Sequence, residues 1–245
     1  HNTNKTYKEV ADVMEVFMKE GIDGTVGFVQ NEKFYDAIQE TQQRTGKKMI
    51  VISTPGINTD CTQEADDENR ATFDKEAELG ATVSMPHTCS TDTLLDRMTR
   101  TIRYGETFCK MIRERGMIPG LSTHLNESVI YADETDLDVG TYIQIYNAQG
   151  FLMPLEIDWV NNIICNAKKP VITIKPFAAG RIPPFVGLAF SWATLRPQDM
   201  VTVGCMTPDE AKEVIELSYR FLDNQKTAMD LQATRSKASV LPKDD

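Results

Sequence analysis

The sequence predicts an α/β fold of the TIM type, a (β/α)8 barrel whose first strand is missing from this chain. Short β-rich runs alternate with helical segments along most of the 245 residues, and repeated units of this kind form parallel strands. No glycine-rich GxGxxG segment follows an early strand, which disfavours an open dinucleotide-binding sheet. The first regular element is a helix, as expected of a barrel whose first strand lies upstream.

Seven runs rich in apolar and β-branched residues are predicted to be strands. They cover residues 24–29, 48–53, 81–85, 117–122, 141–146, 170–175 and 200–204. A helix is predicted before the first strand and after each of the seven. Residues 1–230 are therefore expected to form one barrel domain, followed by a polar tail at 231–245.

The helices are predicted from apolar periodicity and end signals. Capping boxes at Thr6–Glu9 and Thr207–Glu210 begin the first and last helices, which extend through Phe17 and to about residue 226. The intervening helices are expected at 33–45, 64–79, 91–115 in one piece or two, a short segment after Asn126, 155–167 and 184–195.

Composition excludes several classes of protein. Acidic residues outnumber basic ones by 36 to 26, and no basic stripe is present, so nucleic-acid binding is not expected. No apolar run approaches the roughly 18 residues needed to cross a bilayer. We expect a soluble protein, cytoplasmic or exported if a signal was removed upstream of His1. Five cysteines without a CxxC motif indicate small core residues more than disulfides or zinc ligands.

In a barrel of this type the active site lies at the carboxyl ends of the strands. His87 and His124 follow neighbouring predicted strands, where each could donate a proton, bind a metal or shape a loop. A metal would need a third ligand such as Glu156, Asp158 or Cys205. No HxH or HExxH spacing is present, so we predict no metal site.

Lys175 ends the apolar run VITIK. It could bind an anion, pair with a carboxylate such as Glu156, or form a Schiff base if burial lowers its pKa. The loop 175–181 is rich in small residues, and Gly180 and Arg181 within it favour phosphate binding.

The segments TYIQIYN at 141–147, ITIKPFAAGR at 172–181 and VTVGCMTPDE at 201–210 resemble the aldo-keto reductase superfamily. The stretch 120–124 resembles that family's G-x-S-N segment. The resemblance implies an (α/β)8 barrel with a nicotinamide cofactor, NAD or NADP, across the strand ends. It implies that Ser122 and Gln144 hold the carboxamide, that Tyr146 stacks on the ring and that Gly180 and Arg181 approach the pyrophosphate. It also matches His87 to the catalytic histidine.

The sequence departs from the family at the catalytic tetrad. Val26 and Gly27 stand where the family has an aspartate, Pro55 follows Thr54 in place of a lysine, and the acidic tyrosine has no match. A tyrosine without that lysine and aspartate is a poor acid at neutral pH.

We therefore predict an NAD(P)-linked oxidoreductase of the aldo-keto reductase-like type, with a rearranged or lost tetrad and a small-molecule substrate. Two alternatives stay open. One is a non-redox barrel enzyme (a lyase, isomerase or metal-assisted hydrolase) that uses His87, His124 and Lys175. The other is a barrel that binds a small molecule without catalysis.

Overall fold

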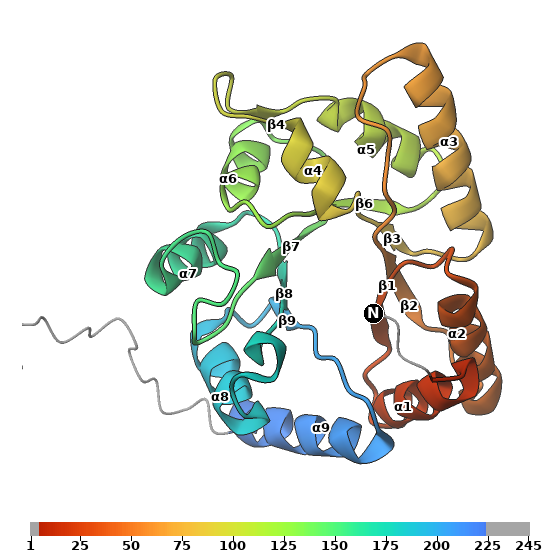
Figure 1. The fold of residues 1–245 in the computed structure, drawn as a ribbon, viewed down its shortest axis with the longest axis vertical. Helices are drawn as coiled ribbons and strands as arrows, with labels where there is room; N and C mark the ends of the chain where they lie inside the picture. The colour runs from red at the N-terminus through yellow and green to blue at the C-terminus, as the bar shows by residue number, and fades with distance from the viewer. Residues whose placement is uncertain (1–4, 224–245) are drawn as a thin grey trace, which may run out of the picture.

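The computed structural model describes residues 5–223, and its centre is a curled parallel sheet that forms a half-barrel (Figure 1). The strands are β1 (Gly24–Gly27), β2 (Ile50–Ser53), β3 (Val83–Ser84), β6 (Ile118–Ser122), β7 (Thr141–Ile145), β8 (Val171–Ile174) and β9 (Met200–Val201). They pair in chain order, each parallel to the next. The predicted TIM-type architecture is confirmed, and each strand of this sheet lies inside its predicted range.

Helices surround the outside of this sheet (Figure 1). They are α1 (Tyr7–Lys19), α2 (Glu32–Thr45), α3 (Gln63–Glu78), α4 (Thr88–Leu94), α5 (Gly105–Arg113), α6 (Glu127–Glu134), α7 (Ile157–Asn166), α8 (Pro184–Thr194) and α9 (Pro208–Asp223). The capping box predicted at Thr6 is present, because Thr6 and Glu9 each accept a hydrogen bond from the other's backbone N–H. Gly46 ends α2 in the left-handed conformation, which suits a glycine.

The two faces of the sheet pack differently. Side chains that point into the barrel form a small apolar cluster centred on Ile52, Met85, Ile143 and Ile172. The opposite face packs on the helices in a larger core that includes Tyr142. Since successive side chains of a strand alternate between faces, the inward residues determine which side chains reach the central space at the strand ends.

The helical segment predicted at 91–115 is in two pieces, and the hairpin between them was not predicted. Residues 91–115 form the two helices α4 and α5 with a hairpin of β4 (Leu95–Asp96) and β5 (Thr101–Ile102) between them. The Asp96 carboxylate accepts hydrogen bonds from the N–H groups of Met98 and Thr99. Hydrogen bonds from a side chain to nearby backbone N–H groups compete with helix formation. The Asp96 carboxylate therefore ends the helical segment here.

The sheet is open between its first and last strands. β1 and β9 are the two edges of the sheet order and are not paired with each other. Outside this opening α1 packs against α9 (Figure 1), and the Tyr219 hydroxyl donates to the Glu20 carbonyl at 2.9 Å. The helix ring is thus continuous where the sheet is not.

Within the described residues, no helix combines the length and the apolarity required to cross a membrane. The expected polar tail at 231–245 lies outside the described residues.

Candidate active site

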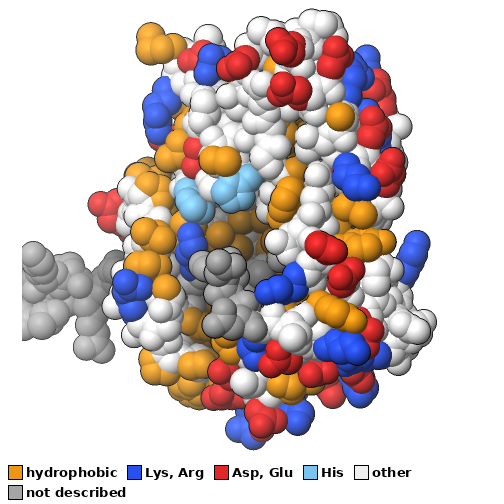
Figure 2. Space-filling model, turned by 45° about the vertical axis from the view of Figure 1, so that its right-hand side comes forward, with side chains coloured by type: hydrophobic (Ala, Val, Ile, Leu, Met, Phe, Trp, Pro, Cys, Tyr) orange, Lys and Arg blue, Asp and Glu red, His pale blue; other side chains and the backbone are white. Residues whose placement is uncertain are grey.

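Four of the predicted site residues lie at the carboxyl ends of three strands of the sheet. His87 follows β3, Ser122 ends β6, His124 lies two residues beyond it, and Lys175 follows β8. Ser122 pairs in register with the inward-facing Ile143, so its side chain also faces the barrel interior. Figure 2 shows histidine side chains next to each other at the edge of a hollow in which hydrophobic side chains are visible.

Lys175 and His124 are in direct contact. The Lys175 ammonium nitrogen lies 3.5 Å from Nε2 of His124. Burial lowers the pKa of the Lys175 amine. The pKa of His124 is also lowered, first by burial and then by the positive charge of Lys175. Both shifts favour the uncharged forms, which are the forms that accept protons or act as nucleophiles.

The structure does not pair Lys175 with a carboxylate. Across residues 5–223, no Asp or Glu oxygen lies within ion-pair distance of its nitrogen. Glu156, the partner considered from the sequence, instead occupies the position before the first turn of α7. Within residues 5–223, the ion pair considered for Lys175 is therefore absent.

Lys175 also has an unusual backbone. Its φ angle is +61°, in the left-handed region that side-chain-bearing residues avoid. The turn it makes ends β8 directly and begins the loop that contains the short helix η1 (Ala178–Gly180). Residues in such conformations concentrate at functional sites.

Asp92 on α4 holds the segment that carries His124. Its carboxylate accepts the Thr123 hydroxyl at 2.5 Å and the His124 backbone N–H at 3.3 Å. The Thr88 hydroxyl donates to the other carboxylate oxygen at 2.8 Å. Asp92 was not predicted as a site residue, because its role depends on the contact between α4 and the end of β6.

A thiol lies beside the second histidine. Nδ1 of His87 is 3.1 Å from Sγ of Cys89 and accepts the Cys89 backbone N–H at 3.3 Å. Cys89 is exposed, as are Cys61 and Cys165, and within the described residues only Cys109 is buried. The expectation that most cysteines belong to the core is therefore wrong, and Cys89 was not among the predicted site residues.

The structure does not bring Gln144 and Tyr146 to this rim. Gln144 is fully buried on the helix side of the sheet, where its amide contacts Asn126 and donates to the carbonyls of Thr123 and Ile143. The Tyr146 hydroxyl lies 3.0 Å from Thr194 Oγ1 and accepts from Asn161. Both side chains share the outward face with Tyr142, as strand alternation requires.

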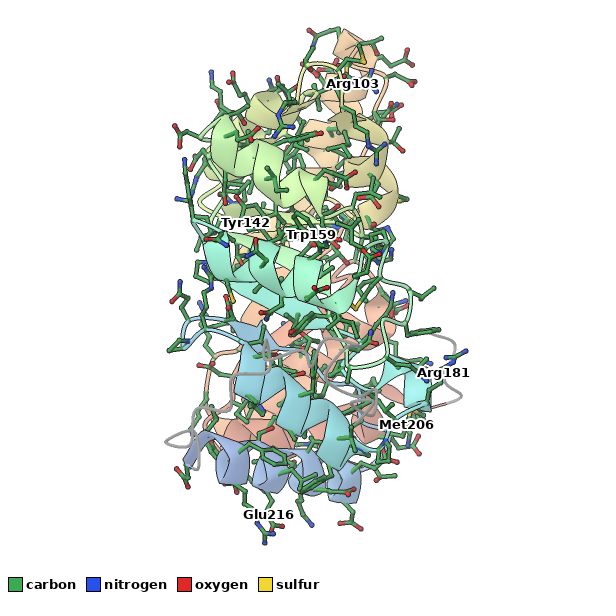
Figure 3. The ribbon with its side chains drawn as sticks, turned by 90° about the vertical axis from the view of Figure 1, so that its left-hand side faces the viewer. Arg103, Tyr142, Trp159, Arg181, Met206 and Glu216 are labelled. Carbon is green, nitrogen blue, oxygen red and sulfur yellow. The ribbon has the colours of Figure 1, made fainter. Side chains whose placement is uncertain are left out.

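The loop 175–181 binds mostly to itself. The N–H groups of Ala178, Gly180 and Arg181 all donate to carbonyls within the loop. The Arg181 guanidinium lies 4.0 Å from the centre of the Phe151 ring and donates to the Ala178 carbonyl. Figure 3 shows Arg181 at the same end of the barrel as Met206, which follows β9. The loop is thus at the carboxyl rim, with the N–H groups of Ala178, Gly180 and Arg181 used internally.

Trp159 on α7 points outward from the helix layer (Figure 3) and is 60% exposed. In the described part of the chain, no three His, Cys, Asp or Glu side chains gather closely enough to hold a metal ion.

Comparison with known proteins identifies the fold. No protein-family model and no curated sequence matches the chain. Among solved structures, PA4992 of Pseudomonas aeruginosa, called a "putative aldo-keto reductase", superposes with a TM-score of 0.68 over 90% of this chain and 83% of that one. A second structure so called gives 0.65, covering 89% of this chain and 85% of the other. Both are 13% identical to this chain.

Barrels of other classes are similar as well. The phospho-2-dehydro-3-deoxyheptonate aldolase of Thermotoga maritima superposes with a TM-score of 0.56 at 10% identity, covering 91% of this chain and 67% of that one. At such identities the likeness establishes a shared fold, and fold alone does not determine chemistry.

Proposed function

We propose that this protein is a barrel enzyme that acts on a small carbonyl compound through the amine of Lys175. The observation that carries the proposal is the contact between Lys175 and His124 at the carboxyl rim, 3.5 Å apart and without a carboxylate partner for the lysine in the described structure. A desolvated lysine is the usual nucleophile for Schiff-base formation.

The chemistry follows from the two neighbouring bases. The uncharged Lys175 amine attacks the carbonyl carbon, a C–N bond forms, and the carbonyl oxygen takes up a proton. Loss of that oxygen as water leaves an iminium ion, which withdraws electrons from the neighbouring carbon. His124 is placed to move protons between the amine and the oxygen, and its lowered pKa keeps it able to accept one at neutral pH. The activity this supports is that of a lyase or isomerase.

Borohydride trapping tests the proposal. The protein is incubated with simple ketones and aldehydes, such as pyruvate and dihydroxyacetone, and then reduced with borohydride, which converts an iminium ion to a stable secondary amine. We expect the added mass on the peptide that contains Lys175 and not on the one that contains Lys212, an exposed lysine on α9. Labelling that spreads over surface lysines, or that persists in Lys175→Met, would contradict the proposal.

A nicotinamide-dependent carbonyl reductase is the second candidate. It is favoured by the inward-facing Ser122 and by the structural similarity to the proteins called aldo-keto reductases. Gln144 and Tyr146 do not fit the role of cofactor ligands, because their polar groups already bind protein atoms on the other face of the sheet. Fluorescence titration with NADH and NADPH separates the candidates, since the lysine mechanism needs neither.

A further inference from the structure

The outer face of α8 is apolar although it borders solvent. α8 lies between α7 and α9 in the helix ring (Figure 1), and its eleven residues include no charged side chain. Gly187, Leu188 and Ser191 are buried on its inner side. On the other side Phe185 is 59% and Val186 is 44% exposed. A helix that is apolar on all sides is ordinarily buried on all sides, so α8 has the composition of a helix with a partner on its outer face.

The neighbouring helix α9 has a different outer face. Lys212 pairs there with Asp209, and Arg220 pairs with Glu216. All four side chains are more than 60% exposed, as is usual for the solvent side of an amphipathic helix. The apolar outer face is therefore a property of α8 and not of the whole helix ring.

The exposed apolar surface continues from α8 onto the end of α9. The rings of Phe185 and Phe221 meet edge to face with their centroids 5.2 Å apart, and Leu222, next to Phe221, is 39% exposed. We define the α8 patch as the surface formed by Phe185, Val186, Ala189, Ala193, Phe221 and Leu222.

The α8 patch is bulky at one end and shallow at the other. Phe185, Ala189 and Ala193 are spaced four residues apart and so lie in one row along the helix. Phe185 and Ala193 are about 12 Å apart along the helix axis. If a second α8 runs antiparallel across a two-fold axis at Ala189, each Phe185 covers the Ala193 of the other copy. A two-fold interface needs a surface that is complementary to itself in this way.

The size and charge of the α8 patch also suit a second copy of the chain. Its exposed side chains leave on the order of 300 Å² of apolar area in water. A stable dimer buries about 800 Å² on each subunit, with an apolar centre and a polar rim, so the α8 patch matches the centre and the ion pairs of α9 match the rim. The chain carries a net charge of −10, and an uncharged face is where two such copies repel each other least.

We propose that this protein forms a two-fold dimer through the α8 patch, with the two α8 helices antiparallel and crossing at Ala189. α8 begins near the carboxyl rim, because it follows β8 and the loop 175–181. The rims of the two copies therefore face opposite directions. The contact covers outer helices and leaves Lys175 and His124 accessible, so the dimer does not depend on the reaction proposed for them.

Sedimentation equilibrium of the 245-residue chain tests the proposal. We expect a reversible dimer whose population rises with protein concentration between about 1 and 100 µM, as mass action requires. Phe185→Glu puts a charge into the contact twice and should weaken the dimer by roughly a hundredfold or more, as expected for a central interface residue. Met98→Glu makes the same change of charge at the exposed hairpin, where Met98 is 93% exposed, and should leave the dimer unchanged.

Cross-linking tests the geometry separately. In Ala189→Cys the introduced thiols of the two copies lie beside the two-fold axis, so a short bismaleimide should join them, and peptide mass spectrometry distinguishes this product from links between native cysteines. Met98→Cys should give no such product. A monomer at the highest concentration overturns the proposal, and so does a dimer that Phe185→Glu leaves intact or that gives no link at position 189. Ala193→Glu replaces Phe185→Glu if circular dichroism shows that the latter does not fold.

Discussion

The side-chain nitrogen of Lys175 lies 3.5 Å from Nε2 of His124, although the two residues are 51 positions apart in the sequence. Parallel strands bring their carboxyl ends to one rim, and two residues that follow different strands can therefore come into contact. Burial disfavours the charged form of both groups, and the charge of Lys175 further lowers the pKa of His124, so the pair holds fewer protons than the same two side chains in water.

Lys175→Met is expected to raise the pKa of His124, because the variant removes the positive charge that helps to lower it. Burial remains as the larger cause, so the pKa should stay below its ordinary value. NMR titration of the imidazole carbon-bound protons measures the change. Lys212→Met, on the exposed face of α9, is the control. An identical His124 titration in both variants would show that the two groups do not interact.

The lowered pKa of His124 also has a consequence for folding. Between its folded pKa and the higher unfolded value, the unfolded chain binds more protons at this site, so stability increases with pH across that window and is lost as the pH falls. In His124→Gln, the free energy of unfolding measured in urea should decrease less as the pH falls. An unchanged decrease would mean that other groups cause the pH dependence.

Cys89 is expected to react with iodoacetamide faster than Cys61 and Cys165, the other exposed thiols of the described chain. Nδ1 of His87 lies 3.1 Å from the Cys89 sulfur, and an imidazole that hydrogen-bonds a thiol favours nucleophilic attack by the sulfur. Burial raises the pKa of Cys165. Peptide mass spectrometry gives the three rates from one sample. In His87→Gln the advantage of Cys89 should disappear, and its persistence would argue against the histidine.

Asp199→Asn should destabilise the protein by about 3–5 kcal/mol, the usual cost of removing one partner of a buried ion pair. The Asp199 carboxylate accepts two hydrogen bonds from the Arg196 guanidinium, at 2.7 and 2.9 Å, and the N–H of Val171 at the start of β8. Its side chain is fully buried. Urea unfolding measures the loss. The control is Asp209→Asn, which breaks an exposed ion pair and should cost about 0–1 kcal/mol. Comparable losses of stability in the two variants would show that burial of the Asp199–Arg196 pair does not determine its contribution.

Glu76→Gln should stabilise the protein more near pH 8 than near pH 4. Burial raises the pKa of the Glu76 carboxyl, and one of its oxygens lacks a hydrogen-bond partner in the described structure. A raised folded pKa means that the folded state binds more protons, so wild-type stability falls as the pH rises from the unfolded to the folded value. We expect a difference on the order of 1 kcal/mol. Glu78→Gln, at an exposed site of α3, should show no such pH dependence.

Much of the fold could be predicted because its signals are local. Apolar runs, together with end signals such as the Thr6 capping box and Gly46, were enough to predict the positions of the strands and of most helices. The hairpin at 95–102 was missed because its decisive contact, from Asp96 to the next turn, looks like an ordinary polar helix position.

The candidate site was predictable only in part. Strand ends located Lys175 and His124, because position along a parallel strand determines which rim a residue reaches. Whether the side chains of Gln144 and Tyr146 point inward or outward depends on which face of β7 lines the barrel. The run from 141 to 146 does not reveal this, because both faces of the strand are buried. Asp92 and Cys89 depend on tertiary contacts of α4 that leave no sequence pattern.

The left-handed backbone of Lys175 has a consequence for directed evolution of this protein. Such a conformation costs an L-residue roughly 1–2 kcal/mol relative to glycine. A library selected for thermal tolerance alone should therefore accumulate glycine at this position, whereas a library selected for turnover of a carbonyl compound should retain lysine.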